Sequence, residues 1–217
     1  MGRVGGVVMS LDIPSLLIGK AMGGGGGGGG GDDPKLPDEY QRVEYLDFTP
    51  NAGFQIDIPS AALWEIVCSS DTTEDNHSVF GKKQYTSGSS GGDFNISVAN
   101  ADGIQSLVSW AKSGSNLHTQ YPAIVEGEKV TLRALFTNTM TSAFIGMIMN
   151  RTGYYNSWDG KFYSLKGWDY LTQELLADFV PCYKKADTTI GIYDTVAKVF
   201  YSTISGNGTV AKGPDAN

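Results

Sequence analysis

The chain has 217 residues with 29 glycines, 11% aromatic and only 18% charged residues, which suits an all-β domain with many turns better than a helical bundle. Its formal net charge of −7 argues against a nucleic-acid partner, because a protein that binds phosphates needs clustered lysines and arginines. The chain also lacks a polybasic run that would bind an anionic membrane. We therefore expect the negative charge to keep the protein soluble.

Residues 1–22 form a short apolar segment, MGRVGGVVMSLDIPSLLIGKAM. Asp12 and Pro14 interrupt its apolar run and no small-residue cleavage pattern follows, so we expect no signal peptide. The segment is also too short and broken to span a bilayer. Asp12 can cap a helix and Pro14 suits its first turn, but such a helix has too few apolar residues for a core of its own. We therefore expect an anchor that packs against another copy or a larger assembly. The alternative is a segment without a packing role, with Met9 as the true initiator.

Nine consecutive glycines, Gly23–Gly31, follow this anchor. They have no side chains to pack and span roughly 15–18 Å as a random coil, so residues 23–35 are expected to form a flexible linker. A polyglycine helix packed between copies in an oligomeric stalk is the alternative. A phosphate-binding loop is excluded, because no strand precedes the glycines and no Gly-Lys-Ser/Thr sequence ends them.

From Leu36 onward the apolar residues recur with a period of two, and turn sequences return at short intervals. No stretch here has a convincing helical pattern, apart from a short turn near Leu171–Leu176. About ten strands of this kind predict a sandwich of two antiparallel sheets over residues 36–217. The clearest expected strands are GFQIDI, ALWEIVCS, DFNISVAN, KVTLRALF, SAFIGMIM, KFYSLKGW, TIGIYD and KVFYST.

The cysteines and histidines predict no metal site. Cys68 and Cys182 each lie in apolar, strand-like sequence, where a free cysteine behaves as a small buried hydrophobe. Their spacing does not say whether they pair. Two cysteines cannot complete a structural zinc site, and His77 and His118 lack ligand-like spacing. No run resembles an EF-hand loop, so we expect no metal and no other cofactor.

The acidic residues give little sign of catalysis. A glycoside hydrolase of the sandwich type needs two carboxylates that face each other, usually from alternate positions of one strand. Asp57 lies in a predicted strand, but Gln55 and Pro59 flank it. Both histidines are predicted in polar loops, so a Ser or Cys nucleophile has no evident base, and we expect no enzyme. The other carboxylates lie mostly in predicted turns, at Asp71, Glu74, Asp75, Asp102, Glu126, Glu128, Asp159 and Asp187.

Aromatic residues cluster in one predicted loop, GYYNSWDG. We expect Tyr154, Tyr155 and Trp158 to stack on sugar rings while Asn156 and Asp159 bond the sugar hydroxyls, which makes these five residues the candidate carbohydrate site. The alternative for each aromatic is that it folds back to cover the edge of the sandwich. The remaining tryptophans lie in strand-like sequence and are expected in the core: Trp64, Trp110 and Trp168.

The closing sequence indicates the closure of a fold rather than catalysis. Pro181 cannot donate to a strand ladder and fits an edge or a bulge. Gly191 lets the backbone pass closely, and Asp194 can satisfy the amides of a turn. We expect the final glycines to return the last strand beside the first, so that both ends of the domain are held.

Three distinctive stretches follow one another from Gly160 to Pro214: GKFYSLKGWD, DFVPCYKKADTTIGIYD and KVFYSTISGNGTVAKGP. Their counterpart at the start of the domain is LPDEYQRVEYLDFTPNAGFQIDI, Leu36–Ile58. Together these stretches resemble the concanavalin A-like (laminin-G-like) sandwich domains of phage and prophage virion proteins. The middle of the domain is similar only in its strand pattern.

The resemblance implies a jelly-roll sandwich that serves as a lectin-like head on a tail fibre or capsid appendage, made in the bacterial cytoplasm and carried on the virion surface. It implies that residues 1–31 bind other virion proteins and that the ligand is a host or mucosal glycan. A homo-oligomer is expected because the short apolar segment cannot bury itself. The family also includes glucanases, but this chain lacks their acidic strand motif and matches no sugar-site residues. A decoration protein without sugar binding is the alternative, and a glycan-cleaving enzyme of the same fold is a lesser one.

Overall fold

The computed structural model describes residues 35–59, 62–71, 77–82, 94–101, 104–111, 116–118, 123–136, 141–150, 153–155 and 157–216. The chain divides into two compact units, residues 1–33 and residues 34–217. The predicted anchor, residues 1–22, lies outside the described residues, as does the predicted linker apart from Lys35.

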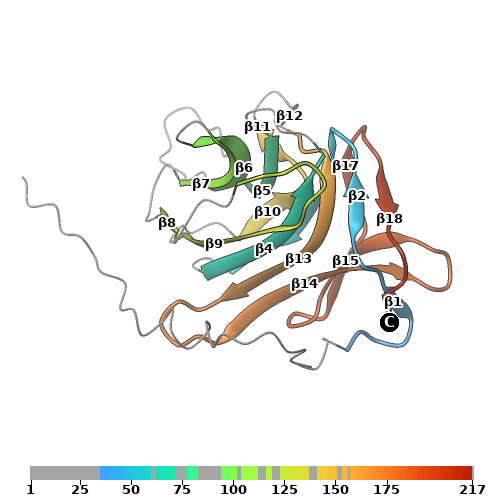
Figure 1. The fold of residues 1–217 in the computed structure, drawn as a ribbon. Coiled ribbons are helices and arrows are strands. Elements are labelled where there is room, and N and C mark those ends of the chain that lie inside the picture. The colour runs from blue at the N-terminus through green and yellow to red at the C-terminus, as the bar shows by residue number, and fades with distance from the viewer. Residues whose placement is uncertain are drawn as a thin grey trace, which may run out of the picture. The chain divides into compact units, whose positions relative to one another are not determined.

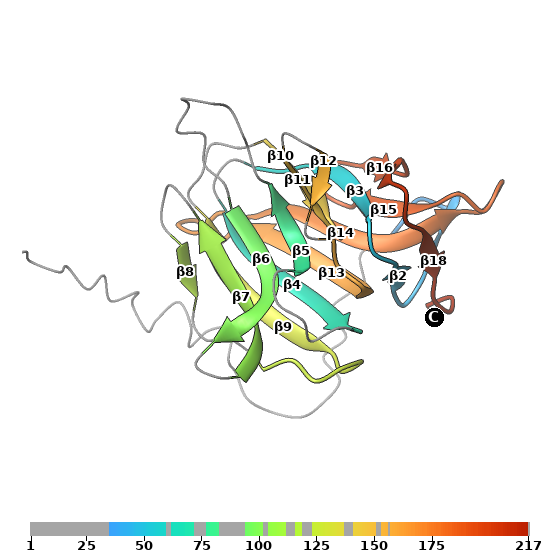
Figure 2. The same ribbon diagram turned by 90° about the horizontal axis from the view of Figure 1, so that it is seen from above.

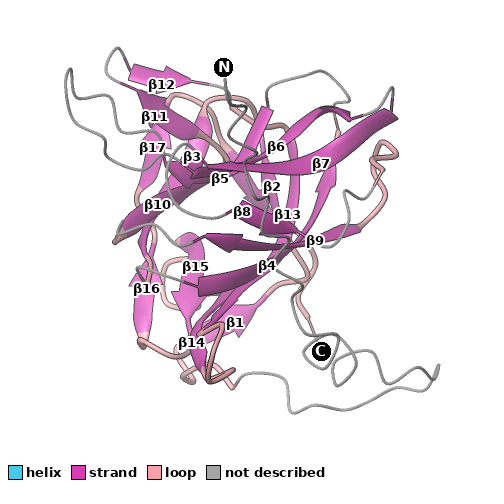
Figure 3. Ribbon diagram, turned by 90° about the vertical axis from the view of Figure 1, so that its left-hand side faces the viewer, coloured by secondary structure: helices cyan, strands magenta, loops and turns pink. Residues whose placement is uncertain are grey.

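The described part of the second unit is all-β, with two antiparallel sheets and no helix (Figures 1 and 3). This confirms the predicted fold class at the level of a β-sandwich. Nothing helical in the described ranges is long and apolar enough to cross a membrane.

The first sheet runs β16-β15-β14-β13-β4-β9-β8, with β1 beside β14, β2 beside β13 and β18 beside β2. The bounds of its strands are β1 (Tyr40–Arg42), β2 (Leu46–Phe48), β4 (Ala62–Ser70), β8 (Asn116–His118), β9 (Val130–Phe136), β13 (Gly160–Trp168), β14 (Leu175–Lys184), β15 (Ile190–Asp194), β16 (Val199–Tyr201) and β18 (Val210–Lys212).

The second sheet runs β17-β3-β10-β5-β6-β7, and two further strands form a separate hairpin (Figure 2). The strands of this sheet are β3 (Ala52–Asp57), β5 (His77–Lys82), β6 (Phe94–Ala101), β7 (Ile104–Ala111), β10 (Ser142–Ile145) and β17 (Ile204–Gly206). The hairpin consists of β11 (Ile148–Asn150) and β12 (Gly153–Tyr155).

The core lies between the two sheets and is built from alternate strand positions. Trp64 on β4 is 1% exposed, and its ring centroid lies 5.2 Å from that of Phe80 on β5, so it bridges the sheets. A Cβ on Gly167 would lie 2.8 Å from the Trp64 ring, so β13 needs glycine where this ring crosses it. Burial of each large apolar side chain contributes roughly 1.5–3 kcal/mol. The alternation predicted for the following positions is confirmed by their burial: Phe54, Ile56, Ile58, Trp64, Ile66, Cys68, Val130, Leu132, Ala134 and Phe136.

One predicted strand is broken in the structure. The apolar run SAFIGMIM forms β10 and then β11, with Gly146 between them at φ +93°. A Cβ at this position would lie 2.6 Å from the Phe48 ring and 2.7 Å from the Ala52 carbonyl oxygen. The Gly146 carbonyl also accepts a hydrogen bond from the Trp158 amide at 2.9 Å. The apolar run is therefore interrupted by a tight backbone turn that only glycine fits.

A second, smaller apolar cluster covers the other face of β14 and β15. Phe179 of β14 lies in the main core, whereas its neighbours Val180 and Cys182 pack with Tyr193, so β14 buries both of its faces. Tyr40 of β1 completes this cluster, with its ring 5.0 Å from that of Tyr193. Cys182 thus lies outside the main core. Both Cys68 and Cys182 are free, and burial raises the pKa of each thiol to about 12.

The closing strands return beside the first strands, as the sequence predicts. β18 pairs with β2, which places Ala211 opposite Asp47 (Figure 1). Farther toward the ends of the domain, Val43 forms a bridge with Asp215. The Ala216 amide donates to the Arg42 carbonyl at 3.0 Å. The two ends of the described domain are therefore tied to each other by backbone hydrogen bonds.

A buried carboxylate lies on β14. Asp178 is 3% exposed, its Oδ2 lies 3.9 Å from Lys166 Nζ, and its Oδ1 has no hydrogen-bond partner among the described residues. Burial raises the pKa of Asp178, and although Lys166, Thr195 and Arg42 lower it, the net direction is upward. Asp194, which also raises it, accepts the Asp178 amide on Oδ1 at 3.2 Å. The ionised form of Asp178 is therefore less stable in the fold than in water.

We expect Asp178→Asn to make the protein more stable at neutral pH. A raised pKa means that the folded state binds the proton more tightly than the unfolded chain, so stability falls as pH rises from about 4 through the folded pKa. In the asparagine variant the free energy of unfolding should no longer show this decrease with pH, as measured by denaturant unfolding across about pH 3.5–7. Asp187→Asn is the matched control, because hydrogen bonds from Thr189 lower the pKa of Asp187 and give its contribution the opposite sign. An Asp178→Asn variant that is less stable at pH 7 but parallel to the wild type in pH dependence would contradict this account.

Candidate functional site

The structure buries Trp158 completely, so its ring offers no face on which a sugar could stack. Its centroid lies 5.8 Å from that of Phe48, and its Nε1 donates a hydrogen bond to Ser70 Oγ at 3.2 Å. The indole is apolar over most of its surface and needs one acceptor when buried, which these neighbours supply. Trp158 belongs to the core, the alternative that the sequence left open.

For the other two predicted aromatics of this segment, the structure describes the backbone but not the side chains. Tyr154 and Tyr155 lie in β12 and pair with Met149 and Ile148 of β11, but their side chains lie outside the description. Asn156 also lies outside the described residues. Their predicted role in sugar binding stays a prediction.

The segment that follows β12 is held firmly at its backbone. Ser157 forms a bridge with Ser78 of β5, and its carbonyl accepts a hydrogen bond from His77 Nδ1 at 2.6 Å. His77 is the first residue of β5 rather than a loop residue, which corrects its predicted place. Together with the Trp158 anchor, these contacts fix the position of Asp159, the next residue along the chain.

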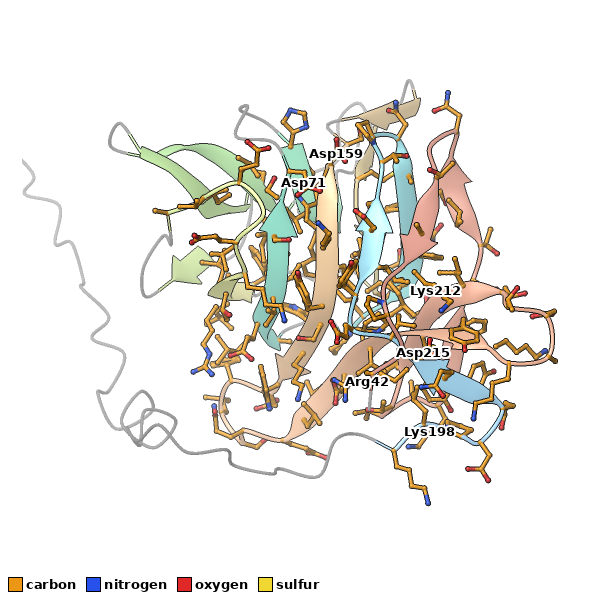
Figure 4. The ribbon with its side chains drawn as sticks, turned by 45° about the vertical axis from the view of Figure 1, so that its right-hand side comes forward. Arg42, Asp71, Asp159, Lys198, Lys212 and Asp215 are labelled. Atoms are coloured by element: carbon orange, nitrogen blue, oxygen red, sulfur yellow. The ribbon has the colours of Figure 1, made fainter. Side chains whose placement is uncertain are left out.

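Asp159 lies in a group of charged side chains at this end of the sandwich, which we call the Lys161 cluster: Asp47, Asp71, Asp159 and Lys161. The Asp71 amide donates to the Asp159 carbonyl at 3.0 Å, which holds the two aspartates side by side (Figure 4). Lys161 Nζ lies 3.7 Å from Asp71 Oδ2. Lys161 also pairs directly with Asp47 of β2, so both side chains leave the same face of the first sheet.

The charges of the Lys161 cluster act on one another. Burial raises the pKa of Asp159, Asp71 raises it further, and His77 and Lys161 lower it. Burial also raises the pKa of Asp47, against the opposite effect of Lys161 and with a further increase from Asp71 and Asp159. Burial lowers the pKa of Lys161, but Asp71 and Asp47 outweigh this and the pKa rises. One ammonium group is therefore shared among partly buried carboxylates.

Ser69 extends the same row on the other side of Lys161. It pairs with Lys161 across β4 and β13, so its side chain leaves the face that carries Lys161 and Asp47. Ser69 is 0% exposed, and its Oγ has no hydrogen-bond partner among the described residues. A buried hydroxyl without a partner is unfavourable by roughly 1–3 kcal/mol.

Two tyrosines stand next to the charged row. Tyr45 and Tyr163 lie two residues before Asp47 and two residues after Lys161, and their ring centroids are 5.6 Å apart in an edge-to-face arrangement. Lys129 Nζ lies 4.0 Å above the Tyr163 ring. The backbone of Gly213 approaches the Tyr45 ring so closely that a Cβ would lie 2.9 Å from it. The face thus combines half-buried aromatic rings, carboxylates and ammonium groups.

Strand alternation in the sequence indicates the residues of this face, although none of them lies in the aromatic segment GYYNSWDG. Tyr45 and Asp47 alternate with buried Leu46 and Phe48, and Lys161 and Tyr163 alternate in the same way with Phe162. In a strand, positions two apart share a face, so these polar and aromatic residues had to lie on the outer face of the sheet. Polar and aromatic residues at the outward positions of predicted strands are therefore the sequence feature that indicates this face.

No group of three His, Cys, Asp or Glu side chains in the described part could hold a metal ion. No protein-family model matches the chain, and neither a curated protein nor a solved structure matches it.

Of the predicted core tryptophans, Trp64 is confirmed, Trp168 is only half-buried and the side chain of Trp110 lies outside the description.

We expect Trp158→Phe to destabilise the protein by about 2 kcal/mol, because it leaves a cavity in the core and removes the hydrogen bond to Ser70. Urea unfolding followed by circular dichroism measures the change. Trp168→Phe makes the same substitution at a half-buried position and should cost less than about 1 kcal/mol. Equal losses in the two variants would show that Trp158 is not the anchor of this segment.

Proposed function

We propose that this chain is a non-enzymatic, concanavalin A-like jelly-roll head that binds carbohydrate on the surface of a phage particle. The observation that carries the proposal is the Lys161 cluster, in which Asp71 and Asp159 are held together by a backbone hydrogen bond beside Lys161. A rigid set of polar groups on an ordered sheet can recognise a ligand without a large entropic cost of ordering.

The chemistry of the cluster suits sugar hydroxyls. Carboxylate oxygens accept hydrogen bonds from hydroxyls, and the Lys161 ammonium donates to hydroxyl and ring oxygens. Asp71 is exposed and Asp47, Asp159 and Lys161 are half-buried, so a ligand can reach them without unfolding the domain. Tyr163 adds an amphipathic side chain of the kind that covers the apolar face of a sugar.

The location on a virion rests on the resemblance of Leu36–Ile58 and residues 160–213 to phage virion domains. Figure 4 is consistent with a displayed head, because Asp71 and Asp159 lie in its upper part while Arg42 and Asp215 lie in its lower part. In this view Arg42 and Asp215, near the two ends of the described domain, lie away from Asp71 and Asp159. In this proposal residues 1–31 bind other virion proteins and form a homo-oligomer.

A second candidate is a glycan-cleaving enzyme, and one observation favours it. The pKa of Asp159 is raised by burial and by neighbouring Asp71, and a raised pKa is what a general acid needs beside a second carboxylate. Binding without cleavage would exclude this candidate, whereas a pH-dependent loss of polysaccharide mass would establish it.

The first experiment applies the full chain and an Asp71→Ala/Asp159→Ala double variant to a glycan array. We expect the wild type to bind a defined set of sugars and the double variant to lose at least about tenfold in affinity, because two charged hydrogen-bond acceptors are removed. Incubation with each bound glycan, followed by mass spectrometry, should show no cleavage.

The matched control is Glu174→Ala/Asp187→Ala, which removes the same charge from two exposed turn residues. It should bind like the wild type. Binding that survives in the Asp71/Asp159 variant would place the sugar site elsewhere. No binding by the folded full chain would favour the decoration protein without a glycan ligand.

A further inference from the structure

The Lys161 cluster carries more negative than positive charge. Its three carboxylates, Asp47, Asp71 and Asp159, share one ammonium group, which is 3.7 Å from Asp71 and paired by register with Asp47. Even a protonated His77, which acts on Asp159, would leave one negative charge in excess. Lys129, another cation on this face, lies over the Tyr163 ring.

The carboxylates repel one another despite Lys161. The pKa of Asp47 is raised by burial first; Lys161 lowers it, and Asp71 and Asp159 each add a smaller increase. The pKa of Asp159 is likewise raised by burial first and then by Asp71. A positive group placed among them would relieve this repulsion.

Ser69 is a second and independent sign that a polar ligand group belongs here. It lies in the row Asp47, Lys161, Ser69 across β2, β13 and β4, and it is 0% exposed with an unpartnered Oγ. Because Ser69 is fully buried, its hydroxyl gains a hydrogen bond only when the side chains that cover it move aside for a polar group. The excess charge and the unpartnered hydroxyl therefore lie on the same face of the sheet.

A chelated metal ion does not fit as the positive group that would balance the excess negative charge of the cluster. Among the described residues no three acidic, histidine or cysteine side chains converge closely enough to hold one. Asp47 lies in β2, Asp71 directly follows β4 and Asp159 directly precedes β13, so the carboxylates come from three separate places in the chain.

We propose that the Lys161 cluster selects a sugar that bears a protonated amine over neutral and acidic sugars. This rests on the proposed function, since it names the class of carbohydrate that the same site binds. The ammonium group of the amino sugar lies between Asp71 and Asp159, and its hydroxyls bond the remaining carboxylate oxygens and Lys161. An acidic sugar is repelled by the same three carboxylates.

The experiment compares two ligands that differ only at nitrogen: a glucosamine oligosaccharide and the N-acetylglucosamine oligosaccharide of the same length. Calorimetry with the full chain at pH 6 should show at least about tenfold tighter binding of the free amine, since charge-assisted hydrogen bonds are roughly twice as strong as neutral ones. The preference should shrink in 0.5 M salt, which screens exposed charges. An oligosaccharide of uronic acid should not bind.

Asp71→Asn and Asp159→Asn, each a near-isosteric loss of one charge, should each reduce the ratio of the two affinities by about fivefold. Asp187→Asn changes the net charge equally at an exposed turn and should leave the ratio unchanged. An equal effect of Asp187→Asn would show attraction to the net charge of the chain and overturn the inference.

The remaining outcomes separate the two proposals. Equal affinity for the free and the acetylated amine overturns the selectivity while carbohydrate binding stands. Tight binding of the uronic acid oligosaccharide does the same. Absence of binding to every glycan tested, by a protein with wild-type thermal stability, overturns the proposed function itself.

Discussion

The burial of the Trp158 indole is the constraint on which the Lys161 cluster depends. The ring lies against Phe48, and Gly160 passes so close that a Cβ would lie 2.8 Å from the indole and 2.2 Å from the Ser69 carbonyl oxygen. Position 160, at φ +151°, therefore accepts only glycine. The chain between Trp158 and Lys161 has almost no freedom, so Asp159 and Lys161 occupy fixed places on either side of a glycine.

The Lys161 cluster is less stable than the fold could make it. Asp47 and Asp159 are desolvated enough for their pKa values to rise, and Ser69 keeps a buried hydroxyl without a partner. Apolar residues at these outward positions would remove both costs. Features that cost stability tend to collect where a protein binds something, because selection for stability alone would remove them. These costs support the proposed ligand site, because Asp178 carries similar costs but is buried, whereas Asp71 of the cluster is exposed.

The sequence predicted the fold well because strand alternation is a local property. Phe54, Trp64 and Phe136 were assigned to the core from a period of two alone, and the structure buries all three. The break at Gly146 was missed, since a positive φ cannot be seen in an apolar run that otherwise looks continuous. Sheet order and register also depend on contacts far apart in the chain, which no local pattern specifies.

The candidate site was predicted only in part, and the reason lies in how tryptophan behaves. The sequence GYYNSWDG was predicted to carry the site, but Trp158 lies in the core and only Asp159 belongs to the Lys161 cluster. Composition alone cannot distinguish an aromatic residue that stacks on a ligand from one that fills the core. Asp47 and Lys161 were missed because they come together only when β2 pairs with β13, more than a hundred residues later in the chain.

The closing sequence, which indicates only closure of a fold, also supports the site. β18 places Ala211 beside Asp47, and Asp47 lies beside Lys161, so three strands from the two ends of the domain form one row. Gly213 then packs its backbone on the Tyr45 ring, where any side chain would collide with the aromatic atoms. The opening and closing stretches of the domain therefore hold Asp47 and Tyr45 in place. Closure of the fold and geometry of the cluster are consequences of the same strand pairing.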